Sequence, residues 1–206
     1  MALVKLNNRG VRSATTFGSI SALGEMTFIK KITASADSTI SFVDGTSDVV
    51  LDDTYKEYMF TFKDLHPGTD EVGFRFNLSA DSGSNYNVTK TSTQFYAEHD
   101  DGDTATALSY WTGGDLAQGT GVQKLGLNIG NDNNQTLSGY LRLFNPSSTV
   151  FVKHFMGRVN TEADNDNTSD NFIAGHANTT SAVDAIQFSM SSGNIDAGDI
   201  CLYGIK

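Results

Sequence analysis

The residues best suited to chemistry form an acidic run near the middle of the chain, where positions 99–103 read HDDGD. Carboxylate oxygens in loops of this kind are ligands for calcium, which makes Asp100, Asp101 and Asp103 candidate metal ligands. The run lacks the later Glu and the full spacing of an EF-hand loop, so a solvated acidic turn is the preferred interpretation. Residues 164–167 (DNDN) leave the same two alternatives open.

The chain has four histidines and a single cysteine. His154 and His176 fall in strand-like runs and could converge in space, although a hydrogen-bonded structural histidine is the more common outcome. Cys201 alternates with Tyr203 and Ile205, which predicts a buried structural thiol. The sequence contains no HExxH, GxSxG, Walker or GxGxxG motif. Enzymatic activity would require paired carboxylates, or His154 and His176, to converge in a cleft, and we expect neither an enzyme nor a cofactor, with calcium left open.

Aromatic side chains near predicted turns are the other candidates for binding. Tyr86, Tyr110 and Trp111 could stack on sugar rings, although packing at a rim or in the core is the commoner role of such residues. Loops on a rigid scaffold are where binding usually resides. The polar loops expected here cover residues 99–104, 112–121, 130–136 and 162–170.

The charge of the chain limits its partners. It contains 14 basic and 24 acidic residues, which gives a formal net charge of −10. An acidic surface repels phosphate backbones and anionic lipid surfaces, so neither nucleic acid nor a membrane is an expected partner. The N-terminus lacks the apolar core of a signal peptide, and no run approaches the length of a membrane span. We expect a product that is made and folded in a cytoplasm.

The pattern of the chain predicts an all-β fold. Gly numbers 20 and Pro only 2, and about ten short alternating runs are separated by polar turns. We expect residues 25–206 to form a single antiparallel β-sandwich that is jelly-roll-like. The expected hairpins pair 27–33 with 39–43, 139–144 with 149–155, and the run at 185–190 with that at 199–205.

The stretch from Tyr55 to Tyr86 is the organising unit of this fold, with two antiparallel strands joined by a turn at 65–70. Successive side chains of a strand point to opposite faces, so the aromatic positions of both runs should face one core. The side chains expected to be buried are Tyr58, Phe60, Phe62, Phe74, Phe76, Leu78, Leu141, Leu143, Phe151, Phe188, Ile200 and Leu202.

Residues 1–24 differ from the rest, because they are polar, Gly-punctuated and relatively basic. Lys5, Arg9 and Arg12 make this the most basic part of an acidic protein. We expect an extended N-terminal arm with two open roles. It is either a loose terminus or a docking arm that lies on an acidic neighbour.

Several stretches resemble small virion proteins of tailed bacteriophages, especially marine ones. The shared motif runs through the Tyr55–Tyr86 stretch and includes Leu65, Pro67 and Gly83 among its turn and packing residues. The opening MALVKLNNRG and the ending, from Ser192-Gly193 through Tyr203-Gly204, are similar to the termini of the same proteins. The resemblance therefore covers nearly the whole chain. It implies an all-β, non-enzymatic particle component.

The expected function is thus a structural component on the exterior of a tailed phage particle, made in the host cytoplasm. A tail-fibre or adsorption role is slightly preferred over head decoration, and an extracellular carbohydrate-binding module is the alternative. The expected partners are other virion proteins, a host surface glycan or protein, and the chain itself. We expect a homotrimer, because a small sandwich on a particle gains attachment strength by multivalency and closed symmetry.

Overall fold

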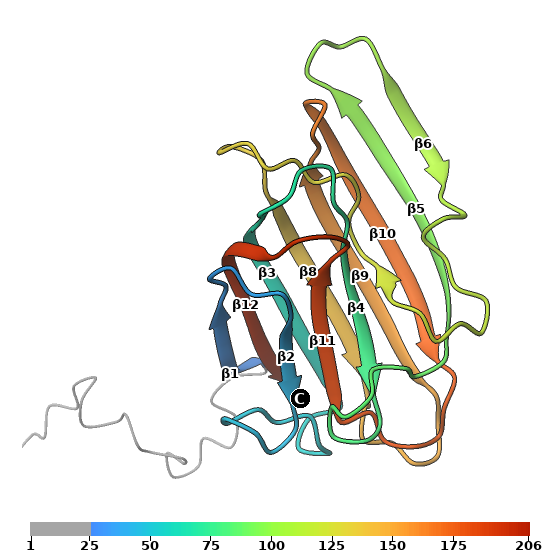
Figure 1. The fold of residues 1–206 in the computed structure, drawn as a ribbon. Coiled ribbons are helices and arrows are strands. Elements are labelled where there is room, and N and C mark those ends of the chain that lie inside the picture. The colour runs from blue at the N-terminus through green and yellow to red at the C-terminus, as the bar shows by residue number, and fades with distance from the viewer. Residues whose placement is uncertain (1–25) are drawn as a thin grey trace, which may run out of the picture.

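The structure is a computed structural model that describes residues 26–206, and its regular elements are all β-strands. They form two antiparallel sheets (Figure 1). In spatial order, the strands of the larger sheet are β1 (Met26–Thr33), β12 (Ile195–Ile205), β3 (Glu57–Pro67), β8 (Leu137–Phe144), β9 (Lys153–Glu162), β10 (Asn167–Ala177), β5 (Lys90–Asp100) and β6 (Thr106–Tyr110). Those of the smaller sheet are β2 (Ile40–Val43), β11 (Ala185–Met190), β4 (Phe74–Ser79) and β7 (Gln123–Lys124).

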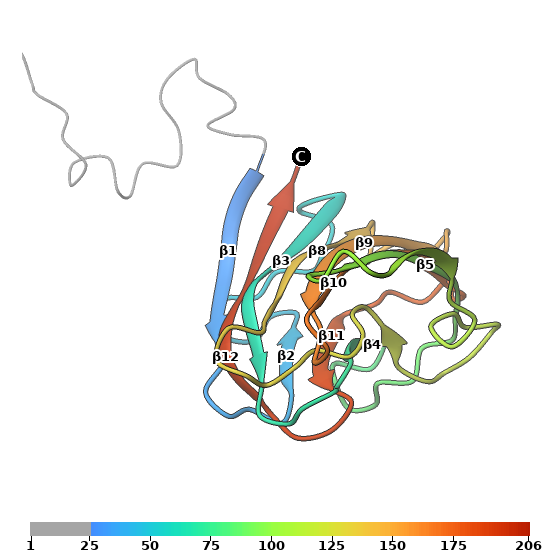
Figure 2. The ribbon, with the colours of Figure 1, turned by 90° about the horizontal axis from the view of Figure 1, so that it is seen from above.

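The two sheets pack face to face, and the larger one curves around the smaller (Figure 2). The chain crosses repeatedly from one sheet to the other, as it does in jelly-roll-like sandwiches. The predicted all-β antiparallel sandwich is therefore confirmed. The expected arm at 1–24, with Lys5, Arg9 and Arg12, lies outside the described residues.

The pairing of the strands differs from the sequence prediction at three places. The hairpin between β8 and β9 is confirmed. The expected hairpin of β1 with β2 is wrong, because β1 pairs with β12 and β2 with β11. The same holds for β11 with β12 and for the central pair, β3 with β4, since each pair is divided between the two sheets. A turn between two strands does not tell a hydrogen-bonded hairpin from a crossing between layers.

One hydrophobic core lies between the sheets. Eleven of the twelve side chains expected to be buried are at most 3% exposed. Phe151 is the exception and is 68% exposed. It belongs to the β8–β9 connection, where its backbone N–H donates to Ser148 Oγ at 3.0 Å, and β9 begins only at Lys153. The prediction that the strand starts at residue 149 was therefore wrong.

Three further predictions need correction. Cys201 is only half-buried, because it alternates with the inward-facing Ile200 and Leu202 and so faces away from the core. The loop expected at 162–170 is mostly strand: β9 ends at Glu162, and β10 starts at Asn167 after a tight turn. The alternating run at 124–129 (KLGLNI) also predicts a strand, but only its first residue, Lys124, lies in one, because β7 covers Gln123–Lys124.

Candidate functional site

The acidic run forms the turn between β5 and β6. The carboxylate of Asp100 accepts hydrogen bonds from Thr104 N at 2.9 Å, from Thr104 Oγ1 at 2.5 Å and from Ala105 N at 2.6 Å. These bonds, with that from the Thr104 hydroxyl foremost, lower the pKa of Asp100 to about 2. Asp100 is thus an ionised residue that closes its own turn.

The other two carboxylates of the run have different neighbours. Asp103 is 92% exposed and lies 3.2 Å from His99 Nε2, while the backbone N–H of Asp101 donates to Asp166 O at 3.2 Å. Within residues 26–206, no three or more His, Cys, Asp or Glu side chains are grouped so as to hold one metal ion. Calcium binding by Asp100, Asp101 and Asp103 stays a prediction.

The structure separates the three aromatic residues singled out as sugar-binding candidates. Tyr110 ends β6, is 54% exposed and donates its hydroxyl to Asp115 Oδ2 at 2.6 Å. Trp111 lines a hollow of about 240 Å³, and Lys124 Nζ lies 4.8 Å from the centre of its ring. Tyr86 lies in the β4–β5 connection, packed beside Gly83. Tyr110 and Trp111 are consecutive residues, and Tyr86 lies in a different connection.

A row of mostly aromatic side chains, of which the sequence analysis singled out only Tyr110, crosses the outer face of the larger sheet. Strand register places Tyr110, Phe95, Phe172, Arg158 and Tyr140 side by side on five successive strands. The rings of Phe95 and Phe172 are stacked, with centroids 4.8 Å apart and planes within 6°. We call these five residues the aromatic row. Each strand supplies one member, so no local sequence pattern reveals the row.

A paired arginine lies within the aromatic row. The guanidinium carbon of Arg158 is 4.8 Å from the centre of the Phe172 ring. Its Nε donates to Asp170 Oδ1 at 2.9 Å and its second nitrogen to Oδ2 at 2.5 Å, which raises the pKa of Arg158. The bidentate contact gives the pair a defined mutual geometry. It places charged hydrogen-bonding groups next to the half-buried ring of Phe172.

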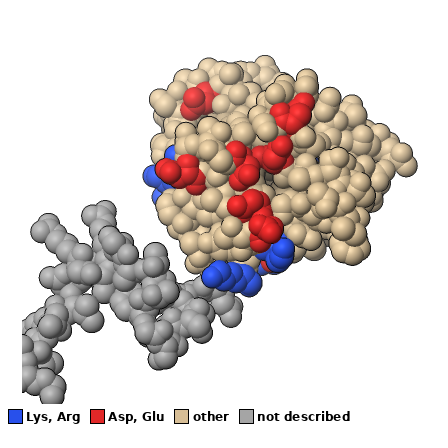
Figure 3. Space-filling view, turned by 90° about the horizontal axis from the view of Figure 1, so that it is seen from below, with Lys and Arg blue, Asp and Glu red and all other residues tan. Residues whose placement is uncertain are grey.

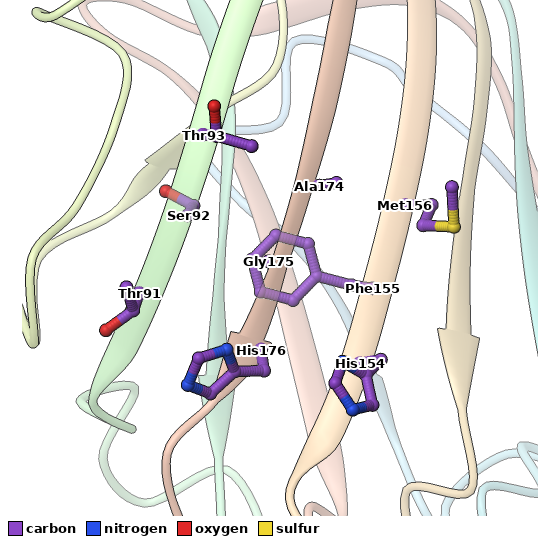
Figure 4. Close-up of a pocket in the computed structure, with 9 residues that line it drawn as sticks. All are labelled: Thr91, Ser92, Thr93, His154, Phe155, Met156, Ala174, Gly175 and His176. Atoms are coloured by element: carbon purple, nitrogen blue, oxygen red, sulfur yellow. The ribbon is translucent and has the colours of Figure 1, made fainter.

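Two adjoining hollows follow the aromatic row along the outer face. The first, of about 330 Å³, lies among Phe95, Tyr140 and Phe172. The second, of about 480 Å³, extends towards His154 and His176 (Figure 4). The hollows share Thr93, Met156 and Ala174 in their linings. The small side chains on β5 and β10 leave room between the larger ones.

Strict alternation along β9 and β10 produces this surface. On β9, Phe155 and Val159 are fully buried, whereas Met156 between them is 54% exposed. Position 175 on β10 accepts only glycine, because a Cβ there would lie 2.5 Å from the ring of Phe155. The buried ring therefore sets the floor of the larger hollow, and the outward side chains form its rim.

His154 and His176 do converge, as the sequence analysis allowed. They are directly opposed on β9 and β10, with ring centroids 6.0 Å apart. Among residues 26–206, neither ring makes a hydrogen bond to another residue, and a structural role for the two histidines stays an alternative.

Acidic side chains are concentrated at one end of the sandwich. The end of the sandwich that carries the β2–β3, β4–β5 and β10–β11 connections shows many Asp and Glu side chains and few Lys or Arg (Figures 1 and 3). Asp44, Asp52, Asp81 and Asp184 belong to these connections. Such an end repels phosphate backbones and attracts cations.

The outer face has the groups of a binding surface. The exposed rings of Phe95, Tyr110 and Tyr140 offer apolar contact, and the Arg158–Asp170 pair offers directed hydrogen bonds. No helix among residues 26–206 has the length and apolar character of a membrane span. Comparison of the chain with protein families, with curated proteins and with solved structures finds no match.

Proposed function

We propose that this protein is a non-enzymatic structural component on the exterior of a tailed bacteriophage particle, made in the host cytoplasm, and that its outer face is a contact surface. The proposal combines two kinds of support. The opening, the Tyr55–Tyr86 stretch and the ending resemble small virion proteins of such phages. The aromatic row and its hollows supply a surface suited to contact.

The observation that carries the contact role is the exposure of large apolar side chains on one sheet face. Phe95 is 41% exposed, Tyr140 39%, Met156 54% and Leu108 76%. These residues lie on neighbouring strands of the same sheet, so they form a shared surface and not scattered exceptions. Contiguous apolar surface rimmed by polar groups marks an interaction site on a soluble protein.

An adsorption role is preferred over head decoration because of what the aromatic row can bind. A sugar ring has an apolar face, which stacks on an aromatic plane, and hydroxyls at its edge, which need directed partners. Phe95, which is 41% exposed, supplies a ring plane, whereas Phe172 lies between Phe95 and Arg158 and supports both, and the Arg158–Asp170 pair lies nearby. A host surface glycan is the partner that fits both features.

The second candidate function is an extracellular carbohydrate-binding module that does not belong to a particle. The same stack of Phe95 on Phe172 favours it, since the contact chemistry is identical. The two candidates separate on one point: a virion component co-purifies with particles at a fixed stoichiometry, and a free module does not.

The adsorption role is tested by competition between purified protein and phage for susceptible cells. The wild-type protein should bind cells and slow phage adsorption. The double variant Phe95→Ala/Tyr140→Ala should lose at least about tenfold in cell binding, because central aromatic contacts dominate binding energy. Phe151→Ala is the matched control: it removes an aromatic ring that is 68% exposed but lies outside the aromatic row.

The opposite results are equally clear. Wild-type protein that binds empty heads at lattice stoichiometry and ignores cells would replace the adsorption role by head decoration. Equal cell binding by the double variant and by wild type would remove the outer face as the contact surface.

The partners expected for this role are other virion proteins and the chain itself. We propose a homotrimer, which multiplies weak contacts by symmetry. Sedimentation at micromolar concentration measures the oligomeric state directly. A single monomeric species there would remove the trimer as a property of the free protein.

A further inference from the structure

Two histidines stand at one end of the larger hollow, apart from the aromatic row. His154 is the second residue of β9 and His176 the last but one of β10, and the two are direct partners in the strand register. Their ring centroids are 6.0 Å apart, with planes at 58° (Figure 4). His154 is exposed and His176 half-buried. Both rings are therefore open to an incoming ligand.

The other two histidines have partners and form useful contrasts. His66 Nδ1 lies 2.8 Å from the carbonyl oxygen of Gln135, and His99 Nε2 lies 3.2 Å from Asp103 Oδ1. These contacts fix the orientation of each ring and give His66 and His99 a structural role. His154 and His176 have no such contact with another side chain of residues 26–206. Their pairing with each other is the feature that needs a chemical explanation.

The separation of the rings suits a shared metal ion. Imidazole nitrogen binds zinc at roughly 2.0–2.1 Å, so two imidazoles on one tetrahedral ion have ring centroids about 5 Å apart. The observed 6.0 Å needs an approach of about 1 Å, which small rotations of exposed side chains provide. Directly opposed residues on antiparallel strands have Cβ atoms roughly 4.5–5.5 Å apart, so the backbone already holds the two ligands together.

The surroundings hold charges of both signs: the buried Lys90 and Lys153 flank Ala177 in the next cross-strand row, on the inner face, while the outer surface at this end is acidic. The histidine pair lies where β9 begins and β10 ends, and this end of the sandwich is the acidic one in Figure 3. Thr91, the next residue in the same cross-strand row, is uncharged, and its hydroxyl accepts a hydrogen bond from Gln118 N at 3.1 Å. No lysine or arginine lines the hollow of about 480 Å³ beside the pair.

We propose that His154 and His176 chelate one divalent transition-metal ion of the zinc, nickel and copper class. Neutral imidazoles are preferred ligands of this class, whereas calcium and magnesium take oxygen. Two protein ligands leave further coordination positions on the ion, which water occupies in the free protein and which face the hollow. The site is distinct from the acidic run at 99–103 in place and in ligand chemistry.

The test uses the full-length, tag-free protein, stripped with a chelator and titrated with Zn²⁺ or Ni²⁺ in a calorimeter. Wild type should bind one ion per chain. His154→Ala and His176→Ala should each weaken binding by at least about tenfold, because each removes one of two ligands. His99→Ala is the matched control, because it removes an exposed histidine beside a carboxylate and should leave the affinity unchanged.

Nuclear magnetic resonance of the unmodified protein gives a second readout that needs no variant. Substoichiometric Ni²⁺ should broaden the ring proton signals of His154 and His176 selectively, and those of His66 and His99 should stay sharp. The proposal is overturned if wild type takes up no ion, if the affinity survives both alanine substitutions, or if the broadening falls on His99. None of these outcomes bears on the proposed particle role, which the cell-binding and particle measurements decide separately.

Discussion

The inner faces of the two sheets, which share one core, use the same kinds of side chain as the outer face of the larger sheet, but in opposite ways. Inside, Phe188 is fully buried, and its ring meets those of five other phenylalanines from the core, at centroid distances from 5.3 to 6.4 Å. Outside, Phe95 stacks on Phe172 at 4.8 Å and remains 41% exposed. The inner rings are enclosed on all sides, whereas the Phe95 ring keeps part of its surface in solvent.

Cationic side chains on the two faces differ in their partners. Arg158, on the outer face, is held by the carboxylate of Asp170. Lys90, on the inner face of β5, is fully buried and has only neutral partners, Asn77 Oδ1 at 2.5 Å and Val88 O at 2.7 Å. The inner face thus buries the charge of Lys90 without a carboxylate partner. On the outer face, the charge of Arg158 is paired with Asp170 and remains in contact with solvent. The inner side therefore serves folding, and the contact role that we propose belongs to the outer face.

The largest expected effect is on the inner face. Phe188→Ala should lower the free energy of unfolding by roughly 3–5 kcal/mol, because it removes a buried ring and leaves a cavity among the other rings. Denaturant unfolding followed by circular dichroism measures this, with Phe151→Ala as the exposed control. A loss below about 1 kcal/mol for Phe188→Ala would contradict the central place given to this ring.

Lys90 should give the inner face a distinctive pH dependence. Burial lowers its pKa to about 8, against about 10.4 in an unfolded chain. Between these values the unfolded chain holds a proton that the folded chain has released, so stability rises with pH across the window. Below pH 8, the destabilising contribution is present in full.

The measurement compares wild type with Lys90→Met, which has a similar shape and no charge. From pH 7.5 to pH 10, wild type should gain about 2 kcal/mol of unfolding free energy relative to the variant. Other titrating groups cancel in the difference. Parallel pH profiles for the two proteins would show that Lys90 is solvated in the folded state.

A smaller effect on stability is expected on the outer face. Phe95→Ala should change the free energy of unfolding by about 1 kcal/mol or less, since much of the ring is already in water. The same change should weaken cell binding by about tenfold. A variant that loses stability as Phe188→Ala does, and binds cells normally, would reverse the roles of the two faces.

The smallest effect is expected at the ion pair. Arg158→Lys keeps the charge but loses the planar fork, so it should leave thermal unfolding unchanged within error. Cell binding should fall on the order of threefold to tenfold, because Lys cannot hold Asp170 in a bidentate pair beside the ring. Unchanged cell binding would remove the ion pair from the contact surface and leave the rings alone responsible.

Sequence alternation was sufficient to predict most of the inner face and could not predict the outer one. Phe60 and Phe76 each lie in a run with a period of two, so their burial follows from one strand at a time. Phe95 and Phe172 are neighbours only because β5 pairs with β10 across 77 residues of chain, between positions 95 and 172. Such contacts depend on the pairing register of strands that are far apart in the sequence, and this register cannot be predicted from the local pattern of a single sequence.

Local patterns also misled where a turn was ambiguous. The turns after β1, β3 and β11 carry ordinary Gly, Pro, Ser or Asp signals, yet each joins strands in different sheets. Phe151 shares the apolar, aromatic character of strand residues but belongs to a connection. His154 and His176 were recognised as strand residues, but their direct opposition depends on the β9–β10 register.

The most direct test of the account is a density map of purified phage particles at a resolution that traces strands. The account predicts the sandwich on the exterior of the particle, with the aromatic row of β5, β6 and β8 to β10 either facing outward or covered by a neighbouring protein. Absence of the protein from purified particles, or a position inside the head, would contradict it.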